Sequence, residues 1–520
     1  MRLNDKGLQK RKKWEAKRYV LPAYDRVLVR EKTRKEPTWI HFGGGNISRA
    51  YIAVLAQRLL DEGLTDKGLI MAEGYDYEII DDVYTPFDDL SIAVTLMPDG
   101  TMKKTVVGSV VESIKMDDGG KKRLCEIFRA QSLQMVSLTI TEKGYDVNLS
   151  DTANGPNKSE TFLGKLTALC YHRYLNGANP LSIVSMDNCS HNGTLLHSAV
   201  RKYAVKWIDR GLAESAFLEY IDNPKLLYFP STMIDKITPY PDETVYNTLT
   251  KDGVKNMKGI VTEKNSFVAP YVNTESPEYL VIEDKFPNGR PPLEKVGVIF
   301  TDIKTVDKAE KMKVSTCLNP LHTALAIFAC MLSYTRVSDA MRDEDILRLI
   351  KRVAEEGLPV VVDPGIISPS EFITTVIDVR FPNPFIPDTP QRIVTDTSKK
   401  LSVRFGETIK AYMSRDLLDV TTLRAIPLVI AGWCRYLLGI DDDGEPFDLE
   451  PDPLLYELRP LLDDVKLGET FETEKILKPI LSNKDIFGID LFEANLDNAI
   501  IEYFELMTKG TGAVRDTLRG

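Results

Sequence analysis

The stretch Thr38-Trp-Ile-His-Phe-Gly-Gly-Gly-Asn-Ile-Ser-Arg-Ala50 carries the clearest structural pattern in this chain. Its first five residues are mostly apolar, which is typical of a buried strand. Apolar side chains then recur at helical spacing over residues 48–62, and residues 68–72 form a second apolar run. A strand, a glycine-rich turn, a helix and a second strand follow in the order of a dinucleotide-binding βαβ unit. We therefore expect such a unit here.

The turn itself has the spacing Gly43-x-Gly45-x-x-Ser48, an imperfect Gly-x-Gly-x-x-Gly fingerprint. The first glycine permits a tight turn, the second lets the backbone approach a pyrophosphate, and a small third residue allows the helix to pack on the strand. Backbone amides at the helix N-terminus then face the phosphates. We expect Gly43, Gly45 and Asn46 to bind a dinucleotide, although an ordinary glycine-rich turn has the same pattern.

The acidic residue Glu73 falls at the predicted end of the second strand. A carboxylate there can accept a hydrogen bond from the 2′-hydroxyl of the NAD ribose, and it repels the 2′-phosphate of NADP. Its spacing from Gly45 is longer than the usual ~20 residues. The position favours NAD as the cofactor, and an ordinary exposed glutamate is the alternative.

Further apolar segments and helices indicate how the rest of the chain is organised. The apolar segments lie at 92–97, 105–112, 134–140 and 181–186, with a helical stretch at about 160–175. They favour an α/β fold on a mostly parallel sheet. Residues 225–300 look extended, and long helical patterns dominate from about 305, at 316–335, 338–356, 369–379, 390–414, 417–439 and 488–508. We predict a Rossmann-type domain over residues 1–300, with a basic N-terminal extension, and a mainly α-helical domain over 301–520.

The composition narrows the functional class. Of 520 residues, 43% are hydrophobic and 27% are charged, which is typical of globular domains. The net charge is 66 − 76 = −10, which disfavours nucleic acid as the main partner. Residues 1–36 nevertheless hold 13 Lys/Arg against 5 Asp/Glu. We expect a solvated amphipathic helix there, with a membrane or RNA contact as the alternative.

Targeting and metal signals are weak. None of the six cysteines forms a Cys-x-x-Cys pair, which is typical of a reducing compartment and provides no zinc ligand set. No apolar segment typical of a secretory signal follows the basic N-terminus, and the apolar run 426–440 is too short to span a bilayer. We expect a soluble cytoplasmic protein that uses no metal.

Polar residues follow the buried patterns at two places. Asn188 comes after the apolar run 181–186, where a strand end would face a binding crevice, although a turn-forming cap is the alternative. Lys313, Asn319 and His322 lie near the start of a predicted helix. A lysine whose pKa is lowered can act as a general base, whereas a histidine among apolar residues is more often a satisfied core residue.

Seven ordered motifs then support a resemblance. They are His41-Phe-Gly-Gly-Gly-Asn46, Ser137-Leu-Thr-Ile-Thr-Glu-Lys-Gly-Tyr145, Ser185-Met-Asp-Asn-Cys-Ser-His-Asn-Gly193, Phe229-Pro-Ser-Thr-Met-Ile-Asp-Lys-Ile-Thr-Pro239, Val281-Ile-Glu-Asp-Lys-Phe-Pro-Asn-Gly-Arg290, Asn319-Pro-Leu-His322 and Arg380-Phe-Pro-Asn-Pro384 running on to Lys400. Together they resemble the mannitol dehydrogenase family, the polyol-specific long-chain dehydrogenases and reductases, from about residue 38 to about 410.

The resemblance implies a Rossmann-type domain and a helical domain with the active site between them. It implies metal-independent hydride transfer between a nicotinamide and a secondary alcohol or ketone. The catalytic residues would be a lysine acid/base, two asparagines that hold the reacting oxygen and a histidine, here Lys313, Asn188, Asn319 and His322. The substrate-binding residues would be Asp235, Arg392 and Lys400. This agrees with the chemistry, since amide donors and an ammonium stabilise a developing alkoxide.

The lysine departs from the family pattern by one residue. That pattern places it five residues before the asparagine, but Val314 stands there and Lys313 is six before Asn319. Six residues of ideal helix turn about 600°, so the two side chains would point about 120° apart. A π-bulge could absorb the extra residue. Lys311 lies nearly on the same face as His322 and is the second choice.

The substrate class is the remaining question. Family members act on mannitol and fructose, on alcohols such as arabinitol, or on hexuronates. A carboxylate calls for cationic partners, and Arg392, Lys400 and Lys236 are available, but polyol enzymes carry similar residues. The segment 388–396 and the long chain look more like the uronate reductases. We predict reduction of fructuronate to mannonate, with tagaturonate reductase and mannitol 2-dehydrogenase as alternatives.

Two other classes stay open from the sequence. The displaced lysine would permit a non-catalytic protein that binds a dinucleotide or a sugar acid. A sugar-phosphate dehydrogenase would need a second anion site, and the sequence offers no clear basic or glycine-rich one. The sequence does not determine the oligomeric state.

Overall fold

The computed structural model describes the backbone of all 520 residues and every side chain except that of Glu142. Contacts divide the chain into two compact units. The first unit comprises residues 1–97 and 101–307, and the second comprises residues 98–100 and 308–520.

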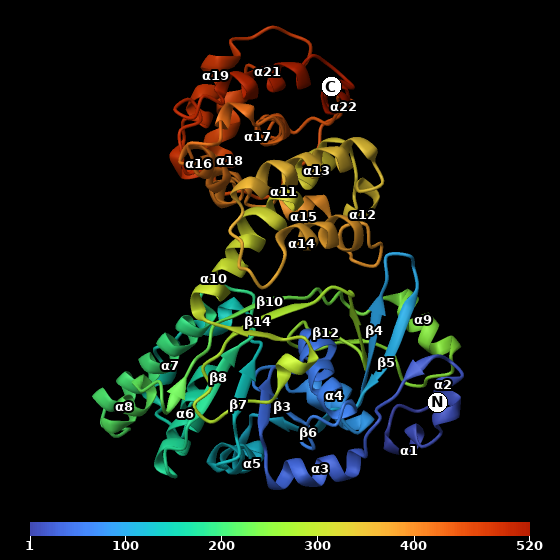
Figure 1. Ribbon diagram of the computed structural model, residues 1–520, viewed down its shortest axis with the longest axis vertical. Coiled ribbons are helices and arrows are strands. Elements are labelled where there is room, and N and C mark those ends of the chain that lie inside the picture. The colour runs from blue at the N-terminus through green and yellow to red at the C-terminus, as the bar shows by residue number, and fades with distance from the viewer. The chain divides into compact units, whose positions relative to one another are not determined.

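A six-stranded sheet forms the centre of the first unit (Figure 1). Its order is β6-β3-β2-β7-β8-β9, and every neighbouring pair is parallel. The strands are β2 (Trp39–Phe42), β3 (Leu69–Glu73), β6 (Val110–Lys115), β7 (Met135–Leu138), β8 (Leu181–Ser185) and β9 (Leu227–Tyr228). The order reverses between β2 and β7, as in doubly wound dinucleotide-binding folds. The predicted Rossmann-type domain is confirmed.

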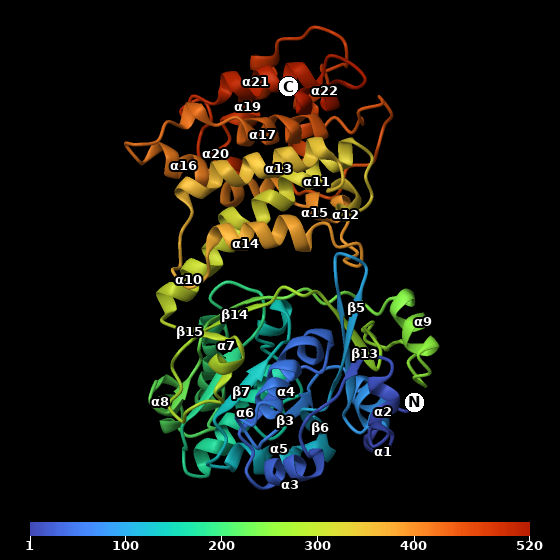
Figure 2. The ribbon, with the colours of Figure 1, turned by 45° about the vertical axis from the view of Figure 1, so that its right-hand side comes forward.

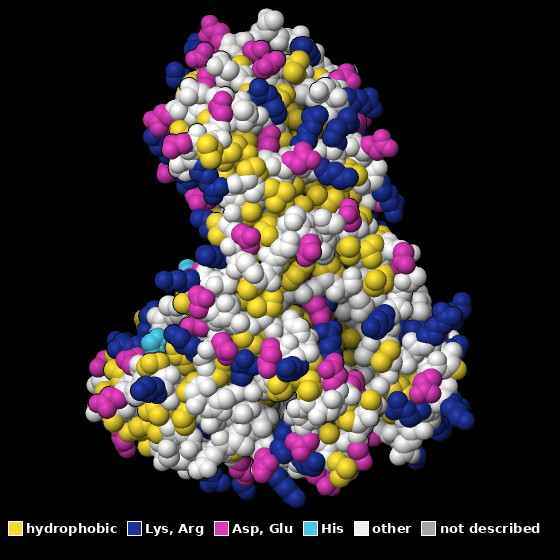
Figure 3. Space-filling view, viewed as in Figure 1, with side chains coloured by type: hydrophobic (Ala, Val, Ile, Leu, Met, Phe, Trp, Pro, Cys, Tyr) yellow, Lys and Arg dark blue, Asp and Glu magenta, His cyan; other side chains and the backbone are white. Residues whose placement is uncertain are grey.

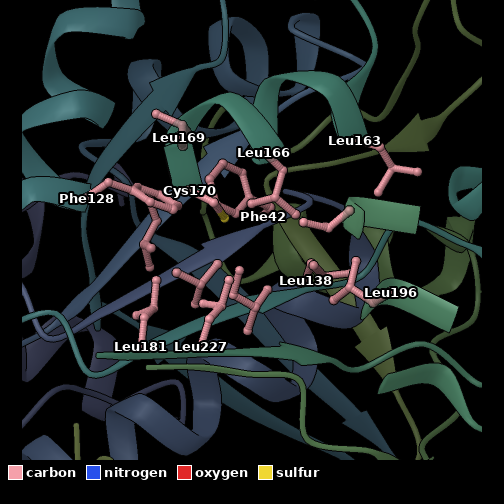
Figure 4. Packing of buried hydrophobic residues seen from close by; sticks show 14 of the residues in the cluster. Phe42, Phe128, Leu138, Leu163, Leu166, Leu169, Cys170, Leu181, Leu196 and Leu227 are labelled. Atoms are coloured by element: carbon pink, nitrogen blue, oxygen red, sulfur yellow. The ribbon is translucent and has the colours of Figure 1, made fainter. Parts of the chain in front are cut away.

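Both faces of this sheet are covered by helices, as a parallel sheet requires. The helices are α4 (Ala53–Asp61), α5 (Asp118–Arg129), α6 (Phe162–Leu175), α7 (Asn192–Asp209) and α8 (Ala216–Asp222). Figure 4 shows Leu163 and Leu166 of α6 packed in one core with Phe42 and Leu138 of the strands. Trp39 lies in the other core, with residues of α4. Successive residues of β2 therefore face opposite cores, which explains its uninterrupted burial.

A second sheet corrects the predicted arrangement of strands. The segments 92–97 and 105–112 were expected in the main sheet, but β4 (Ser91–Leu96) and β5 (Met102–Val107) pair with each other antiparallel. They belong to a sheet of order β1-β5-β4-β13, with β1 (Tyr19–Val20) and β13 (Tyr271–Thr274). The run 105–112 divides at Gly108, because Arg26 packs there and donates to the Gly108 carbonyl at 2.9 Å. Residues beyond it enter the main sheet as β6.

The expectation of one solvated N-terminal helix is wrong. The segment forms α1 (Asp5–Leu8), α2 (Arg11–Glu15), strand β1 and α3 (Arg26–Lys35). Trp14 is fully buried, and Arg26 is 7% exposed and donates to backbone carbonyls. The basic pattern misled because tertiary packing, not helix periodicity, orders this part of the chain. On the face shown in Figure 3, basic and acidic side chains are interspersed.

Smaller elements complete the first unit. An antiparallel and a parallel pairing join β10 (Thr232–Asp235), β14 (Tyr279–Glu283) and β15 (Ile299–Thr301). The hairpin strands are β11 (Ile260–Val261) and β12 (Phe267–Val268), and helix α9 (Glu243–Lys251) precedes them. Short helical segments are the π-helical η2 (Ile80–Tyr84) and the 3₁₀ turns η3 (Thr85–Phe87), η4 (Glu142–Tyr145), η5 (Asp151–Ala153) and η6 (Leu293–Val296).

The second unit is helical, as predicted (Figure 2). After α10 (Ile303–Met312), its helices are α11 (Asn319–Met331), α12 (Val337–Ala340), α13 (Glu344–Gly357), α14 (Pro369–Thr375), α15 (Pro390–Val394), α16 (Glu407–Met413), α17 (Ala425–Tyr436), α18 (Leu455–Leu458), α19 (Thr473–Leu481), α20 (Lys484–Phe487), α21 (Asp497–Met507) and α22 (Ala513–Arg519). Short turns are η8 (Leu358–Val360), η10 (Thr397–Lys399), η12 (Val420–Thr422) and η13 (Arg459–Leu462). Every residue of α17 is buried, which identifies it as a core helix.

Two helical stretches have features that the sequence pattern alone does not show. The predicted single helix 390–414 is broken, because Asp396 has a left-handed φ of 54°. The continuous helical stretch Ile303–Met331 is long and apolar enough to cross a membrane. However, 78% of its apolar window is buried within the protein, as in a core helix.

Candidate functional site

The glycine-rich turn after β2 has the geometry of a phosphate cradle. Gly43 has a φ of 107°, and a Cβ atom there would meet the carbonyl oxygen of Thr139 at 2.3 Å. A Cβ atom at Gly45 would meet nothing within 4 Å, so this residue faces open space. The turn leads directly into a helix whose first segment is the π-helical η1 (Ser48–Ile52). Backbone amides at that N-terminus fit a dinucleotide pyrophosphate.

Tyr84 and Arg49 hold this turn through their side chains. Tyr84 donates its hydroxyl proton to the Gly44 carbonyl at 3.1 Å. Arg49, which is 1% exposed, donates to the Asn46 side-chain oxygen at 2.9 Å and to the Ala269 carbonyl at 2.5 Å. Burial lowers the pKa of Arg49. Asn46 thus uses its side-chain oxygen to brace the turn.

Glu73 has a role that the sequence did not predict. Its Oε2 atom accepts from the Gly44 amide at 2.7 Å, and its Oε1 atom accepts from the amides of Gly74, Tyr75 and Asp76. The side chain is 5% exposed, and burial raises its pKa despite these bonds. The alternative of an ordinary exposed glutamate is wrong. In this geometry Glu73 ties the glycine-rich turn to the loop after β3, and its proposed bond to a ribose hydroxyl stays a prediction.

His41, from the same motif, is a structural residue. It is fully buried, with Nδ1 2.7 Å from the Ser137 hydroxyl and Nε2 3.1 Å from the Thr139 hydroxyl. Burial lowers its pKa to about 3. A histidine that is neutral and hydrogen-bonded on both nitrogens joins β2 to β7.

The loop that carries Asn188 is anchored by its neighbour Asp187. The Asp187 carboxylate accepts from the amides of Ile140 and Thr141 and from the Tyr145 hydroxyl at 2.7 Å. Burial raises the pKa of this carboxyl group. Thr141 has a positive φ of 64°, which this clamp maintains. The ends of β7 and β8 are therefore fixed together beside Asn188.

Asn192 connects the same loop to β10. Its Nδ2 atom donates to the Asp187 carbonyl at 2.9 Å and to the Thr232 hydroxyl at 2.9 Å, and its Oδ1 atom accepts from the Thr232 amide. Asn192 is fully buried, so these bonds satisfy the whole amide. Strand β10 ends at Asp235, which is 7% exposed. The predicted residues Asn188 and Asp235 thus lie on segments that Asn192 holds together.

Lys236 is not available as a carboxylate partner in this structure. Its Nζ atom donates to Glu278 at 3.0 Å and to the Glu275 carbonyl at 2.7 Å. Its side chain is 3% exposed, and burial lowers its pKa. The expectation that Lys236 could receive a substrate carboxylate is therefore wrong.

In the second unit, the predicted π-bulge at the displaced lysine is confirmed. Residues Lys313–Cys317 form the π-helical segment η7, and the Leu318 amide donates to the Lys313 carbonyl at 3.0 Å, five residues back. The extra residue is thus absorbed directly before Asn319, the first residue of α11. Lys313 is 3% exposed. Lys311 is 51% exposed and pairs with Glu407 at 3.3 Å. Of the two candidates, only Lys313 has a buried side chain.

His322 follows one turn after Asn319 on α11. Its Nε2 atom lies 3.2 Å from Oδ2 of Asp388, and its ring stacks on Phe381 with centroids 4.9 Å apart. Burial lowers the pKa of His322, the Asp388 carboxylate opposes that effect, and Arg404 and Arg392 reinforce it. A carboxylate therefore orients this buried imidazole, a typical arrangement for a site histidine.

The two predicted substrate cations are engaged with the protein. Arg392 donates from Nε and from a terminal nitrogen to Oδ1 of Asp388, at 2.9 and 2.5 Å, while its side chain stays 69% exposed. Lys400 donates to the carbonyls of Ile393 and Thr395. Burial lowers the pKa of Lys400, and the charges of Arg404 and Arg392 lower it further.

Sequence reasoning missed Arg404. It lies on the π-helical segment η11 (Ser402–Gly406), is partly buried and donates to the hydroxyl of the fully buried Thr323. Burial lowers its pKa to about 10. The sequence held one signal: Arg404 follows Lys400 by four residues, the spacing of neighbours on a helix face.

Asp452 was also missed. It accepts from the Ser398 amide at 2.8 Å and from the Ser398 hydroxyl at 2.5 Å, two residues before Lys400. Asp452 lies in a late acidic stretch with no motif, so no sequence signal pointed to it.

The three π-helical segments of the second unit share a property. They are η7, η9 (Val376–Arg380) and η11, and they carry Lys313, Arg380 and Arg404. π-Helical turns are rare and concentrate at functional sites. The described residues contain no group of three or more His, Cys, Asp or Glu placed to hold a metal ion.

Comparison with known proteins agrees with this arrangement. The family model for the mannitol dehydrogenase Rossmann domain matches residues 37–295, and that for the mannitol dehydrogenase C-terminal domain matches residues 305–507. The D-mannonate oxidoreductase of Thermotoga maritima is 49% identical over 532 residues, covering 100% of this chain and 98% of that protein. A mannitol 2-dehydrogenase of Emericella nidulans is 29% identical over 473 residues, covering 87% and 86%.

Solved structures show the same fold. Pseudomonas fluorescens mannitol 2-dehydrogenase, in a ternary complex with NAD and D-mannitol, has a TM-score of 0.69 at 24% identity and covers 100% of this chain and 99% of its own. A substrate-free D-sorbitol dehydrogenase has a TM-score of 0.77 at 23% identity, covering 96% and 97%. With both family models matched over most of the chain, this protein belongs to the mannitol dehydrogenase family and is an oxidoreductase.

Proposed function

We propose that this chain is an NAD-dependent fructuronate reductase, which interconverts fructuronate and mannonate. The observation that carries the proposal is its 49% identity, over the whole chain, to a protein named D-mannonate oxidoreductase. Mannonate is the product of reducing the C2 ketone of fructuronate, so that name fits this reaction. The mannitol 2-dehydrogenases are more distant, at 29% identity and below.

The residues divide between the two units. Asn188 and Asn319 would donate hydrogen bonds to the reacting oxygen, and Lys313 would transfer its proton. NADH, when bound, supplies hydride to the ketone carbon. As negative charge develops on the oxygen, the two amides and the ammonium stabilise it, and the ammonium proton moves from Lys313 Nζ to that oxygen. In the reverse direction neutral Lys313 removes the hydroxyl proton.

The glycine-rich turn and Glu73, both in the first unit, support NAD as the cofactor. The open space at Gly45 and the helix N-terminus after it fit a pyrophosphate. Glu73, buried beside the turn, would repel the 2′-phosphate of NADP. A second candidate function, mannitol 2-dehydrogenase, is favoured by the more distant relatives of that name.

The test is NADH or NADPH oxidation, followed by absorbance, with fructuronate, tagaturonate and fructose. We expect NADH oxidation with fructuronate at a kcat/KM at least 100-fold above that for the other two. Activity on fructose alone would replace the proposal with mannitol 2-dehydrogenase, and activity on tagaturonate alone with the epimeric uronate. NADH binding without turnover of any substrate would favour a non-catalytic binding protein.

A further inference from the structure

Two arginines lie close enough to His322 in the second unit to affect its pKa. Arg392 and Arg404 both lower the pKa of His322, after burial, and both lower that of Lys400, whereas Asp396 and Asp452 raise the pKa of Lys400. Asp388 is the carboxylate that pairs with His322. Like charges gathered at a partly buried position repel one another, so such a cluster is stabilised when an anion binds.

The three cations of this cluster differ in whether their N–H groups already have acceptors within the protein. Arg392 directs two of its N–H groups at Asp388, and Lys400 directs its ammonium at two backbone carbonyls. Arg404 donates to one neutral group, the Thr323 hydroxyl. Among the described residues, no carboxylate lies within ion-pair distance of Arg404, and Thr323 is its one side-chain acceptor. A partly buried guanidinium without a counter-ion is costly unless a ligand supplies the charge.

The position of Arg404 is also fixed. It lies on η11, which packs against η7, the segment of Lys313. Its partner Thr323 is fully buried on α11, next in sequence to His322. A guanidinium held at one nitrogen by a core hydroxyl keeps its other N–H groups in a fixed plane. Such a fork matches the two oxygens of a carboxylate.

We propose that Arg404 binds the carboxylate of the sugar-acid substrate and gives this enzyme its preference for a ketouronate over the corresponding uncharged ketose. This inference rests on the proposed function and deepens it, because it names the residue that binds the substrate carboxylate. It moves that role from Arg392, Lys400 and Lys236 to a residue that the sequence did not single out.

Fructuronate and fructose provide a matched substrate pair. Both present the same C2 ketone, and they differ at C6, which is a carboxylate in one and a hydroxymethyl group in the other. The ratio of their kcat/KM values therefore measures recognition of the carboxylate separately from the reduction itself. We would measure this ratio for the wild type, Arg404→Gln, Arg404→Lys, Arg392→Gln and Lys410→Gln. Lys410 is a surface cation that pairs with Glu407 and is the control.

For Arg404→Gln we expect kcat/KM for fructuronate to fall at least 100-fold, mostly through KM, with less than a threefold change for fructose. Arg404→Lys should recover part of the loss, because the charge returns without the fork. Lys410→Gln should leave both values unchanged. Equal losses on both substrates for Arg404→Gln, or a selective loss of fructuronate activity for Arg392→Gln instead, would overturn the proposal. Unchanged NADH binding and thermal unfolding would show that the variants fold.

Failure of the proposed function would look different. A wild type that reduces tagaturonate but not fructuronate refutes the proposed substrate, yet Arg404 is then tested with tagaturonate against tagatose by the same ratio. A wild type with no preference for either ketouronate over its ketose overturns the assignment of Arg404 as well.

Discussion

The Nε2 atom of His322 lies 3.2 Å from Oδ2 of Asp388, and the other oxygen of that carboxylate accepts two N–H groups of Arg392. A carboxylate partner requires a proton on Nε2, so the neutral form of the ring that fits this contact has its lone pair on Nδ1. One acidic residue therefore sets the tautomer of His322 and the direction of Arg392. The residues come from α11, from the loop before α15 and from α15 itself.

Replacing Asp388 should disturb this pair. The pKa of His322 is lowered by burial and raised by Asp388, so Asp388→Asn should lower it further. We expect kcat/KM to fall about 10- to 100-fold from loss of orientation, a typical effect for a partner of a site histidine. The pH–rate profile of Asp388→Asn and of the surface control Asp416→Asn would test this. An unchanged profile for Asp388→Asn would contradict the assignment.

The lysine assignment can be tested with a matched pair. Lys313 is buried in η7, while Lys311 is exposed and paired with Glu407. We expect Lys313→Ala to lower kcat by about 10²- to 10⁴-fold, the usual contribution of a general acid/base. Lys311→Ala should change kcat less than twofold. Comparable losses in the two variants, measured by NADH oxidation, would refute the choice of Lys313.

The isosteric substitution Glu73→Gln should lower both the stability of the protein and its affinity for NADH. Both its oxygens accept from backbone amides, and glutamine would place an NH₂ group against one of them. We expect Glu73→Gln to reduce stability by about 1–3 kcal/mol, the cost of buried groups without partners. NADH affinity should fall at least 10-fold, because the phosphate turn loses its anchor. Fluorescence titration would measure the NADH affinity, and urea unfolding would measure the stability, with the exposed Glu62→Gln as control. Wild-type values of both quantities for Glu73→Gln would rule out this anchoring role.

His41 makes stability depend on pH. Its pKa is lowered from 6.5 to about 3 by burial, so the unfolded chain binds the proton first as pH falls. Its contribution is therefore fully present above pH 6.5 and declines below it, by roughly 1 kcal/mol for each pH unit. The untitratable His41→Gln should show a shallower loss of unfolding free energy between pH 7 and 5. Parallel slopes in urea unfolding would show that His41 is not the titrating group.

Asp452 should influence substrate binding from outside the motifs. It holds Ser398, and with it the turn before Lys400. We expect Asp452→Asn to raise KM for the ketouronate about 3- to 10-fold, because a charge-assisted bond contributes about 1.5–3 kcal/mol and only part of it acts through Lys400. NADH affinity should not change. The neighbouring exposed Asp448→Asn serves as control, and a loss of NADH binding in Asp452→Asn would indicate general unfolding instead.

Local patterns were sufficient for the fold class. The apolar run ending at Phe42, the glycine-rich turn and the helical spacing after it predicted a βαβ unit, because strand and helix periodicities are properties of neighbouring residues. The one-residue displacement of Lys313 predicted a π-bulge for the same reason: the helical register is counted along the chain. The motifs from His41 to Lys400 placed the candidate residues.

Tertiary structure alone determined what those residues contact. The sequence predicted a bond from Glu73 to a ribose hydroxyl, but it did not predict the bond that Glu73 accepts from the amide of Gly44, 29 residues away in sequence. Arg404 became a candidate only because Asp388 accepts the N–H groups of Arg392 and backbone carbonyls accept those of Lys400. A side chain is available for a ligand only when the folded protein leaves its donors or acceptors without partners. That depends on long-range packing, which no local pattern records.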